Sequence, residues 1–213
     1  MRTLGRIDAL WIYPVKSLAP VALKQTRIER EGLPGDRERA LIVRDGHARI
    51  GKTYRGKEHN LLHLGADPQD ALSLAAGRGV TATLETNTAE RFFDARPVSL
   101  LFDRWVDEAS RGLSLELDPQ RWRPNVFVRA AADFTELEND LVGAAIEAGD
   151  ALLRVCETID RCVTTSYDVQ TGEPDPAVLR YVAQERDNVM GVYCVVERAG
   201  NVCVGEDLRL RAR

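Results

Sequence analysis

The sequence of 213 residues is poor in the residues that form metal and redox motifs. Its four cysteines include no CxxC pair, and its three histidines all lie before residue 64, which excludes zinc-finger spacing. No stretch reaches the roughly 18 consecutive apolar residues of a membrane helix. The first residues, MRTLGRIDALWIYPVKSL, lack the apolar core and cleavage site of a signal peptide. We therefore expect a cytoplasmic protein with reduced thiols and no membrane partner.

Common nucleotide and hydrolase motifs are also absent. The sequence contains neither GxGxxG after a strand nor GxxxxGKS or GxxxxGKT, which are the loops that cradle phosphates in nucleotide-binding proteins. It has no GxSxG elbow, which argues against an α/β-hydrolase. A nucleotide-dependent enzyme and a histidine-based hydrolase are therefore not expected.

The overall composition is that of an ordinary globular protein, with 44% hydrophobic and 29% charged residues. A chain of this length forms one large domain or two small intergrown ones. Lys and Arg total 29 against 33 Asp and Glu, so the net charge of −4 argues against nucleic acid as a partner. Only four of the basic residues are lysines, which leaves room for a local arginine-lined pocket that binds phosphate or carboxylate.

Short alternating runs of apolar residues predict a mainly β fold with a few helices, of the α+β class. Many short strands at close intervals favour a β-barrel or sandwich with helical insertions. We expect a hairpin around Gly200, between two of the last strands. The expected strands cover residues 6–13, 22–29, 40–43, 80–85, 113–117, 125–129, 151–156, 190–197, 201–204 and 207–210.

Helix signals are few. The clearest predicts a helix over 176–186, with Asp175 as N-cap and Pro176 at the first helical position. A second is expected over 101–111 with Gly112 as its C-cap. The spacing over 135–148 also fits a helix, although two glycines weaken it. Residues 66–88 give no clear signal.

Cys162 is the best candidate for chemistry. It lies in TIDRCVTT, directly after an apolar strand, beside Arg161 and a run of hydroxyl residues. A neighbouring arginine favours the thiolate, which is the form that attacks electrophiles or ligates metals. The alternative is a small buried hydrophobic residue, as most free cysteines are. The other three cysteines lie in apolar strands and are expected in the core: Cys194 alternates with valines, Cys203 lies between two valines, and Cys156 ends a strand.

Basic residues at three predicted strand ends form a second candidate set. Lys16 and Ser17 follow a strand, Arg37 stands after the turn GLPG, and Arg123 precedes another strand together with Arg121. Each alone is consistent with a solvated turn, where ion pairs contribute little. Beside a candidate thiolate, the set as a whole suits an anionic, phosphate-bearing ligand.

These stretches together resemble the MOSC family, named for the C-terminal domain of molybdenum-cofactor sulfurases. The resemblance covers roughly residues 5–65 and 121–210. Its most specific element is 161–172, which follows the family pattern RCxxTTxDxxTG with Ser166 in place of the second Thr. The other matching elements are IYPVKSL at 12–18, GLPGDR at 32–37, RPN at 123–125 and GED at 205–207.

The resemblance implies a MOSC-like β-barrel with an intergrown N-terminal β-barrel region. Residues 1–118 would form the N-terminal region and residues 119–213 the MOSC core with the Cys162 loop, joined in one compact unit. Arg96 stands where relatives carry a small hydroxyl residue before proline, so we expect it to reshape or narrow the pocket.

The resemblance also implies a cofactor, since the mitochondrial amidoxime-reducing component and similar bacterial proteins hold molybdopterin. Cys162 corresponds to the cysteine that ligates their molybdenum. By the same carry-over, Arg161, Thr165 and Ser166 would line the loop around the metal. The residues expected to contact the pterin or its phosphate are Lys16, Ser17, Arg37, Arg123 and Asn125.

The implied activity is reduction of N-oxygenated, or N-hydroxylated, compounds. The sequence has no flavin-binding pattern and no iron–sulfur cysteine set, so a separate flavin or iron–sulfur reductase would donate the electrons. The first alternative is a carrier of sulfur, as a Cys162 persulfide, or of the cofactor, without reductase activity. The second is a binding module that has lost its cofactor.

Overall fold

A closed barrel forms the centre of the computed structural model, which describes residues 1–55 and 61–211. The first strand is buried at Leu4, Ile7 and Leu10, and it pairs with the last strand on one side. This pairing closes a ring of seven strands in the order β12-β8-β9-β10-β6-β7-β1. The strands are β1 (Arg2–Ile12), β6 (Val98–Phe102), β7 (Val126–Ala130), β8 (Ala145–Ala148), β9 (Ala151–Asp160), β10 (Val189–Arg198) and β12 (Asp207–Leu210).

Neighbouring barrel strands are antiparallel except β6 and β7, which are parallel. Helix α3 (Asp103–Leu113) makes the crossover between them and buries Trp105 against the barrel. The ring of Phe102 stacks on Phe134 with centroids 4.2 Å apart, and Trp105 meets Phe102 edge-on at 4.9 Å. The mainly β, barrel-type fold predicted from the sequence is confirmed.

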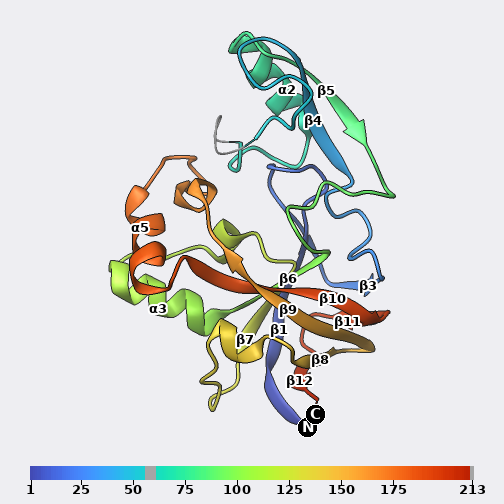
Figure 1. Cartoon of the computed structure of the whole chain (residues 1–213), viewed down its shortest axis with the longest axis vertical. Helices are drawn as coiled ribbons and strands as arrows, with labels where there is room; N and C mark the ends of the chain where they lie inside the picture. The colour runs from blue at the N-terminus through green and yellow to red at the C-terminus, as the bar shows by residue number, and fades with distance from the viewer. Residues whose placement is uncertain (56–60, 212–213) are drawn as a thin grey trace.

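A small lobe with its own apolar core lies at one end of the barrel (Figure 1). It consists of the antiparallel pair β4 (Arg39–Asp45) and β5 (Thr81–Thr86), covered by α2 (Pro68–Gly77). Leu41 and Val43 pack in its core with Ala71 of the helix. The sequence predicted both strands but not α2.

The helix α5 (Pro176–Glu185) begins as predicted, because Asp175 accepts a hydrogen bond from the backbone N–H of Ala177 at 2.9 Å. The second predicted helix is shifted. Residues 101 and 102 belong to the buried strand β6, which the sequence analysis missed. Helix α3 ends at Leu113, and its C-cap is Ser114, whose φ of 51° is left-handed, and not Gly112. The strand predicted over 113–117 is wrong, since its first residue ends α3.

Two other predicted elements divide differently. The helix over 135–148 is wrong except for the short α4 (Glu138–Leu141), because Gly143 turns the chain with φ 83° into β8. The run 22–29 splits into β2 (Val21–Leu23), which extends the sheet beside β1, and β3 (Gln25–Ile28), which belongs to another sheet.

The hairpin predicted around Gly200 is wrong. The strand β11 (Gly200–Cys203) does not return along β10 but pairs with β3 in a two-stranded sheet. Gly200 permits this path, because a Cβ there would lie 2.2 Å from the carbonyl carbon of Asp150 and 2.4 Å from the nitrogen of Ala151.

Gly200→Ala is therefore expected to lower the free energy of unfolding by about 3 kcal/mol, because the clash is with backbone that cannot move aside. Urea denaturation measures this. The control is Gly77→Ala in α2, where a Cβ meets nothing within 4 Å. An equal stability of the two variants would contradict the path described for β11.

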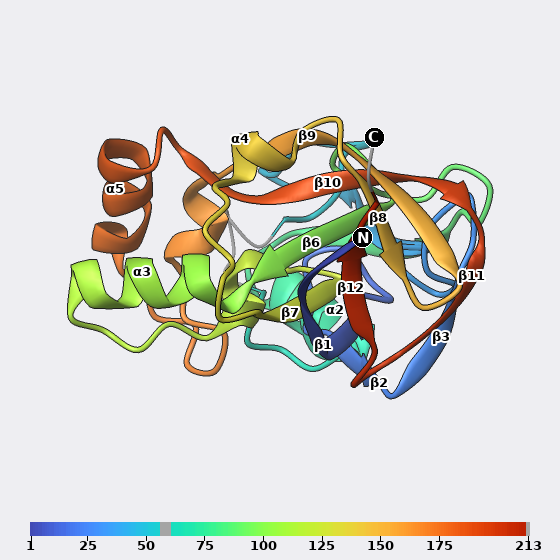
Figure 2. The same ribbon diagram turned by 90° about the horizontal axis from the view of Figure 1, so that it is seen from below.

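Strands from both predicted regions build one barrel, since β1 and β6 lie before residue 118 and the other barrel strands lie after it. The boundary at 118 stays a prediction. The start of β1 and the end of β12 pair with each other at the end of the barrel opposite the lobe (Figures 1 and 2). Over residues 1–55 and 61–211, no helix is long and apolar enough to cross a lipid bilayer.

Candidate active site

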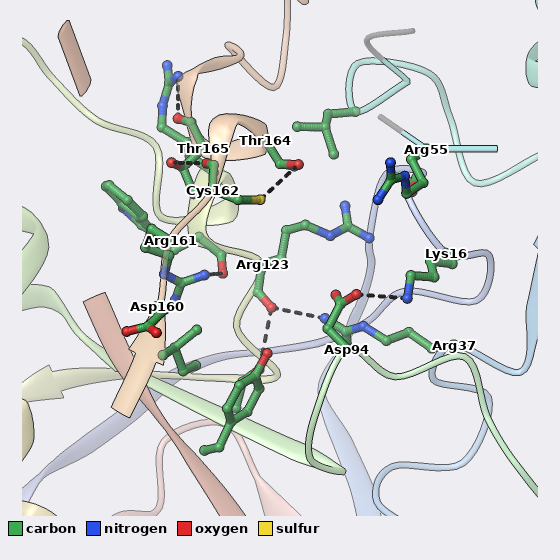
Figure 3. A pocket seen from close by; sticks show the side chains of 17 residues that line it. Lys16, Arg37, Arg55, Asp94, Arg123, Asp160, Arg161, Cys162, Thr164 and Thr165 are labelled. Atoms are coloured by element: carbon green, nitrogen blue, oxygen red, sulfur yellow. Dashed lines mark hydrogen bonds and ion pairs between the residues drawn. The ribbon is translucent and has the colours of Figure 1, made fainter. Parts of the chain in front are cut away.

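A cavity of about 310 Å³ is lined by loops from several parts of the chain, shown in Figure 3. Its wall takes residues from the segment after β1, the turn before β4, the segment before β6 and the end of β9. Two short 3-10 helices, η1 (Pro119–Trp122) and η2 (Val163–Ser166), complete it. The residues predicted for the site that line it are Lys16, Ser17, Arg37, Arg123, Arg161, Cys162 and Thr165.

Three lining residues have left-handed backbone. The φ angles are 73° at Ser17, 51° at Arg37 and 54° at Arg123, none of which is glycine. Such conformations cost energy for residues with a side chain and persist where the surroundings hold them. Hydrogen bonds hold two of them, from the Arg37 N–H to the Tyr13 carbonyl at 2.8 Å and from the Arg123 N–H to the Gln120 carbonyl at 3.0 Å. Strained backbone at three lining positions is typical of a binding site.

The ring of Tyr13 packs against the guanidinium groups of Arg37 and Arg123. Its ring is fully buried, with the Arg123 guanidinium 4.1 Å and the Arg37 guanidinium 4.7 Å from its centroid. The phenol donates to the Pro124 carbonyl at 3.2 Å, and burial raises its pKa. Tyr13 is thus a neutral platform that fixes both guanidinium groups.

The two arginines differ in how their charge is compensated. Arg37 pairs with the buried carboxylate of Asp36 at 2.6 Å, and Asp36 also accepts from the Tyr13 N–H at 2.7 Å. Arg123 instead donates to the neutral carbonyl of Leu18 at 2.8 Å, and its Nη2 is a buried donor without a partner. An unpaired buried guanidinium is costly unless an anion joins it.

Arg161 is the second uncompensated cation. Its Nε donates to the Met190 carbonyl and its Nη1 to the Trp122 carbonyl, both at 2.8 Å. Burial lowers the pKa of Arg123 and of Arg161 to about 10, so both remain charged at neutral pH. Neither forms an ion pair with any residue of 1–55 or 61–211. The cavity therefore holds two guanidinium groups whose hydrogen bonds go to neutral carbonyls and not to carboxylates.

Cys162 stands at the start of η2 with an exposed side chain. Its carbonyl accepts from the Thr165 N–H at 3.0 Å and from the Thr165 hydroxyl at 2.9 Å, which fixes the loop. The thiol donates to the Thr164 hydroxyl at 3.4 Å. Arg121 clamps the loop to η1, since it donates to the Thr165 carbonyl at 3.1 Å and pairs with Asp168 at 3.3 Å. Figure 3 shows the Arg123 guanidinium facing the open space beside this thiol.

The other cysteines are less uniform than predicted. Cys194 is fully buried, as expected for a core residue. Cys156 and Cys203 are only half-buried, so the expectation that they lie in the core is wrong for them.

Several lining residues were missed by the sequence analysis, of which Asp94 matters most. Its carboxylate lies 2.7 Å from the Lys16 ammonium, at the basic end of the cavity, which Lys16, Arg37 and Arg123 line. Partial desolvation raises the pKa of Asp94, but the positive charges of Lys16 and the nearby arginines lower it by more, so its pKa lies below the ordinary value and the carboxylate stays ionised. The expectation that Arg96 narrows the pocket is wrong, because Arg96 pairs with Glu157 at 2.8 Å and is not part of the lining. Polar residues lining the cavity that no motif indicated include Asp94, Arg55, Ser99, Asp160 and Tyr193.

The lining is strongly basic although the chain is acidic. Two acidic side chains, Asp94 and Asp160, face six basic ones in a chain of net charge −4. Low-dielectric walls concentrate such a field and attract anions. The basic lining residues are Lys16, Arg37, Arg55, Arg121, Arg123 and Arg161.

Asn125 and Ser166 lie behind the lining, where both are almost fully buried. The Asn125 side-chain oxygen accepts from the Ser99 N–H at 3.0 Å and from its hydroxyl at 2.9 Å, and the amide nitrogen donates to the Trp11 carbonyl at 3.2 Å. The Ser166 carbonyl accepts from the Asp175 N–H at 2.7 Å, which ties η2 to α5. Both residues hold the walls of the cavity.

Asn125→Ala is expected to lower the free energy of unfolding by about 2–4 kcal/mol, because buried partners on β1 and β6 lose their hydrogen bonds. Thermal or urea denaturation measures the loss, and the exposed Asn139→Ala in α4 is the control. Unchanged stability with weakened ligand binding would contradict the structural role.

No group of three or more His, Cys, Asp or Glu side chains within the described residues is arranged to hold a metal ion. Cys162 is the cysteine among the residues that line the cavity.

Comparison with known proteins places the fold and these residues in a family. The family model described as the MOSC domain matches residues 87–209, and the model of the MOSC N-terminal beta barrel domain matches residues 4–105. The chain belongs to the MOSC family. This family is associated with molybdenum-cofactor-related function. Comparison with curated proteins gives no match.

Solved structures share the architecture of this MOSC protein. The YuaD protein from Bacillus subtilis is 19% identical, with a TM-score of 0.59 over 98% of this chain and 96% of its own. YiiM from Escherichia coli is 13% identical, with a TM-score of 0.51 over 100% of this chain and 71% of its own. At these identities the likeness concerns the fold alone.

Proposed function

We propose that this MOSC protein binds a molybdenum–pterin cofactor in the cavity, with Cys162 as the protein ligand of the metal. The observation that carries the proposal is the pair Arg123 and Arg161, whose buried charges have no carboxylate partner in the described chain. An anionic, phosphate-bearing group would supply the missing partner, and the orphaned Nη2 of Arg123 fits an acceptor oxygen of such a group.

Different parts of the cofactor would bind at the two ends of the cavity. At the basic end, Lys16, Ser17, Arg37 and Arg123 would hold the phosphate and the pterin. At the other end, the Cys162 thiolate is a soft ligand suited to a molybdenum centre that already carries dithiolene sulfurs. The Arg121 clamp on η2 would keep this thiolate in place relative to Arg123.

The activity that best fits this arrangement is reduction of N-oxygenated compounds. When bound, the metal centre supplies the two electrons that cleavage of an N–O bond requires. The exposed Cys162 loop leaves its side of the cavity open to a small substrate. A separate flavin or iron–sulfur protein would supply the electrons.

The test is the molybdenum and pterin content of the chain purified from a host that makes the cofactor, together with reduction of an N-hydroxylated compound after chemical reduction of the protein. We expect near-equal molar amounts of molybdenum, pterin and chain, and release of the reduced nitrogen compound. Protein without molybdenum and pterin would overturn the proposal.

The exposure of the Cys162 thiol supports a second candidate, a sulfur carrier that holds a persulfide on Cys162. Mass spectrometry of the purified chain separates the two. A carrier shows a sulfur adduct on the peptide containing Cys162 and no reductase activity, whereas the reductase shows activity that Cys162→Ala removes.

A further inference from the structure

The exposed side chain of Asp94 forms an ion pair with the largely buried Lys16. Asp94 lies in the segment between β5 and β6, and its side chain is 71% exposed. Its carboxylate nevertheless reaches the Lys16 ammonium at 2.7 Å, and Lys16 is only 17% exposed. Figure 3 shows the carboxylate between Lys16 and Arg37, at the basic end of the cavity.

The two carboxylates near this end are held very differently. Asp36 is fully buried and accepts hydrogen bonds from the Tyr13 N–H and from Arg37, so it is a fixed part of the wall. Asp94 has one ion pair and an otherwise solvated side chain. Because the Asp94 side of this pair is open to solvent, water competes for its carboxylate and the contact is readily exchanged.

We propose that Asp94 is a specificity-determining residue that occupies the anion subsite of the cavity and must leave Lys16 before a ligand anion can bind. The inference rests on the proposed function, because it concerns the same site. A ligand whose contact with Lys16 is no stronger than that of the Asp94 carboxylate gains no free energy by replacing Asp94. A phosphoryl or sulfate dianion gains more from Lys16 and the arginines than Asp94 does, so it displaces Asp94 while common monoanions stay out.

The test is isothermal titration of the cofactor-free full chain with sodium sulfate, a dianion that does not titrate near neutral pH. Asp94→Asn is expected to bind sulfate about tenfold more tightly than wild type, because no internal anion is displaced. Asp94→Ser should give the same gain. The matched control is Glu157→Gln, which removes an exposed, ion-paired carboxylate outside the cavity lining and should leave the affinity unchanged.

A double variant tests whether the effect acts through Lys16. In the Lys16→Met background, Asp94→Asn should change sulfate affinity by less than about twofold, because the displaced contact is already absent. The inference is overturned if Asp94→Asn leaves sulfate binding unchanged or weakens it, if no variant binds sulfate, or if the tenfold gain persists without Lys16. Molybdenum and pterin content of wild type tests the proposed function separately, so the two failures are distinguishable.

Discussion

Cys162→Ser is expected to lower the molybdenum content of the protein to below about a tenth of the wild-type value, since even residues that merely support a metal ligand cost 10–100-fold in affinity when changed. A serine hydroxyl stays protonated at neutral pH, whereas a thiol readily gives the thiolate that ligates metals. The protein should still fold, because the Cys162 side chain is exposed and packs in no apolar cluster. Elemental analysis by mass spectrometry, with a melting curve of the same sample, measures both.

Cys203→Ser provides the matched control for that experiment. Its thiol is half-buried on β11 and does not line the cavity. We expect wild-type molybdenum content in this variant. Full molybdenum in Cys162→Ser, or an equal loss in Cys203→Ser, would contradict the assignment of the ligand.

Arg123→Met is expected to weaken sulfate binding by the cofactor-free chain about 10–100-fold and to prevent retention of the pterin, because a charged donor is lost from the basic end of the cavity. The apo protein should keep its stability to within about 1 kcal/mol. The buried guanidinium has no carboxylate partner, so its replacement by an apolar side chain leaves no buried carboxylate unpaired and removes the cost of burying a lone charge. Calorimetric titration and denaturation measure the two effects.

The pH dependence of anion binding follows from the same group. Burial lowers the pKa of Arg123 to about 10, so its charge is present below that pH and is lost above it. Sulfate affinity of wild type should therefore stay nearly constant from about pH 6 to about pH 9 and fall above about pH 10. Tight sulfate binding by Arg123→Met at pH 7 would contradict this role.

The sequence predicted the local elements well where a start signal and a periodic face coincide. Asp175 and Pro176 predicted α5, and Asp67 and Pro68 form the same signal at the start of α2, where the Asp67 side chain accepts from the Gln69 N–H at 2.9 Å. That helix was missed because its alanine-rich face gives little apolar contrast. The path of β11 was not predictable from local sequence, since it depends on the approach of Gly200 to the backbone of Asp150.

The candidate site was predictable in its members but not in its organisation. Motifs marked Lys16, Arg37, Arg123 and Cys162, which the fold brings to one cavity from distant parts of the chain. No motif indicated Asp94, because its position depends on the folded loop and on a partner far away in sequence. The folded structure is also needed to see that Arg37 pairs with a carboxylate whereas Arg123 does not.

The most direct test that residue 162 ligates the metal places selenocysteine at position 162 and records selenium X-ray absorption of the protein purified with its cofactor. We expect a molybdenum neighbour bonded to the selenium, because we propose residue 162 as the protein ligand of the metal. A sample that contains molybdenum and pterin but gives no molybdenum neighbour around this selenium would show that residue 162 does not bind the metal.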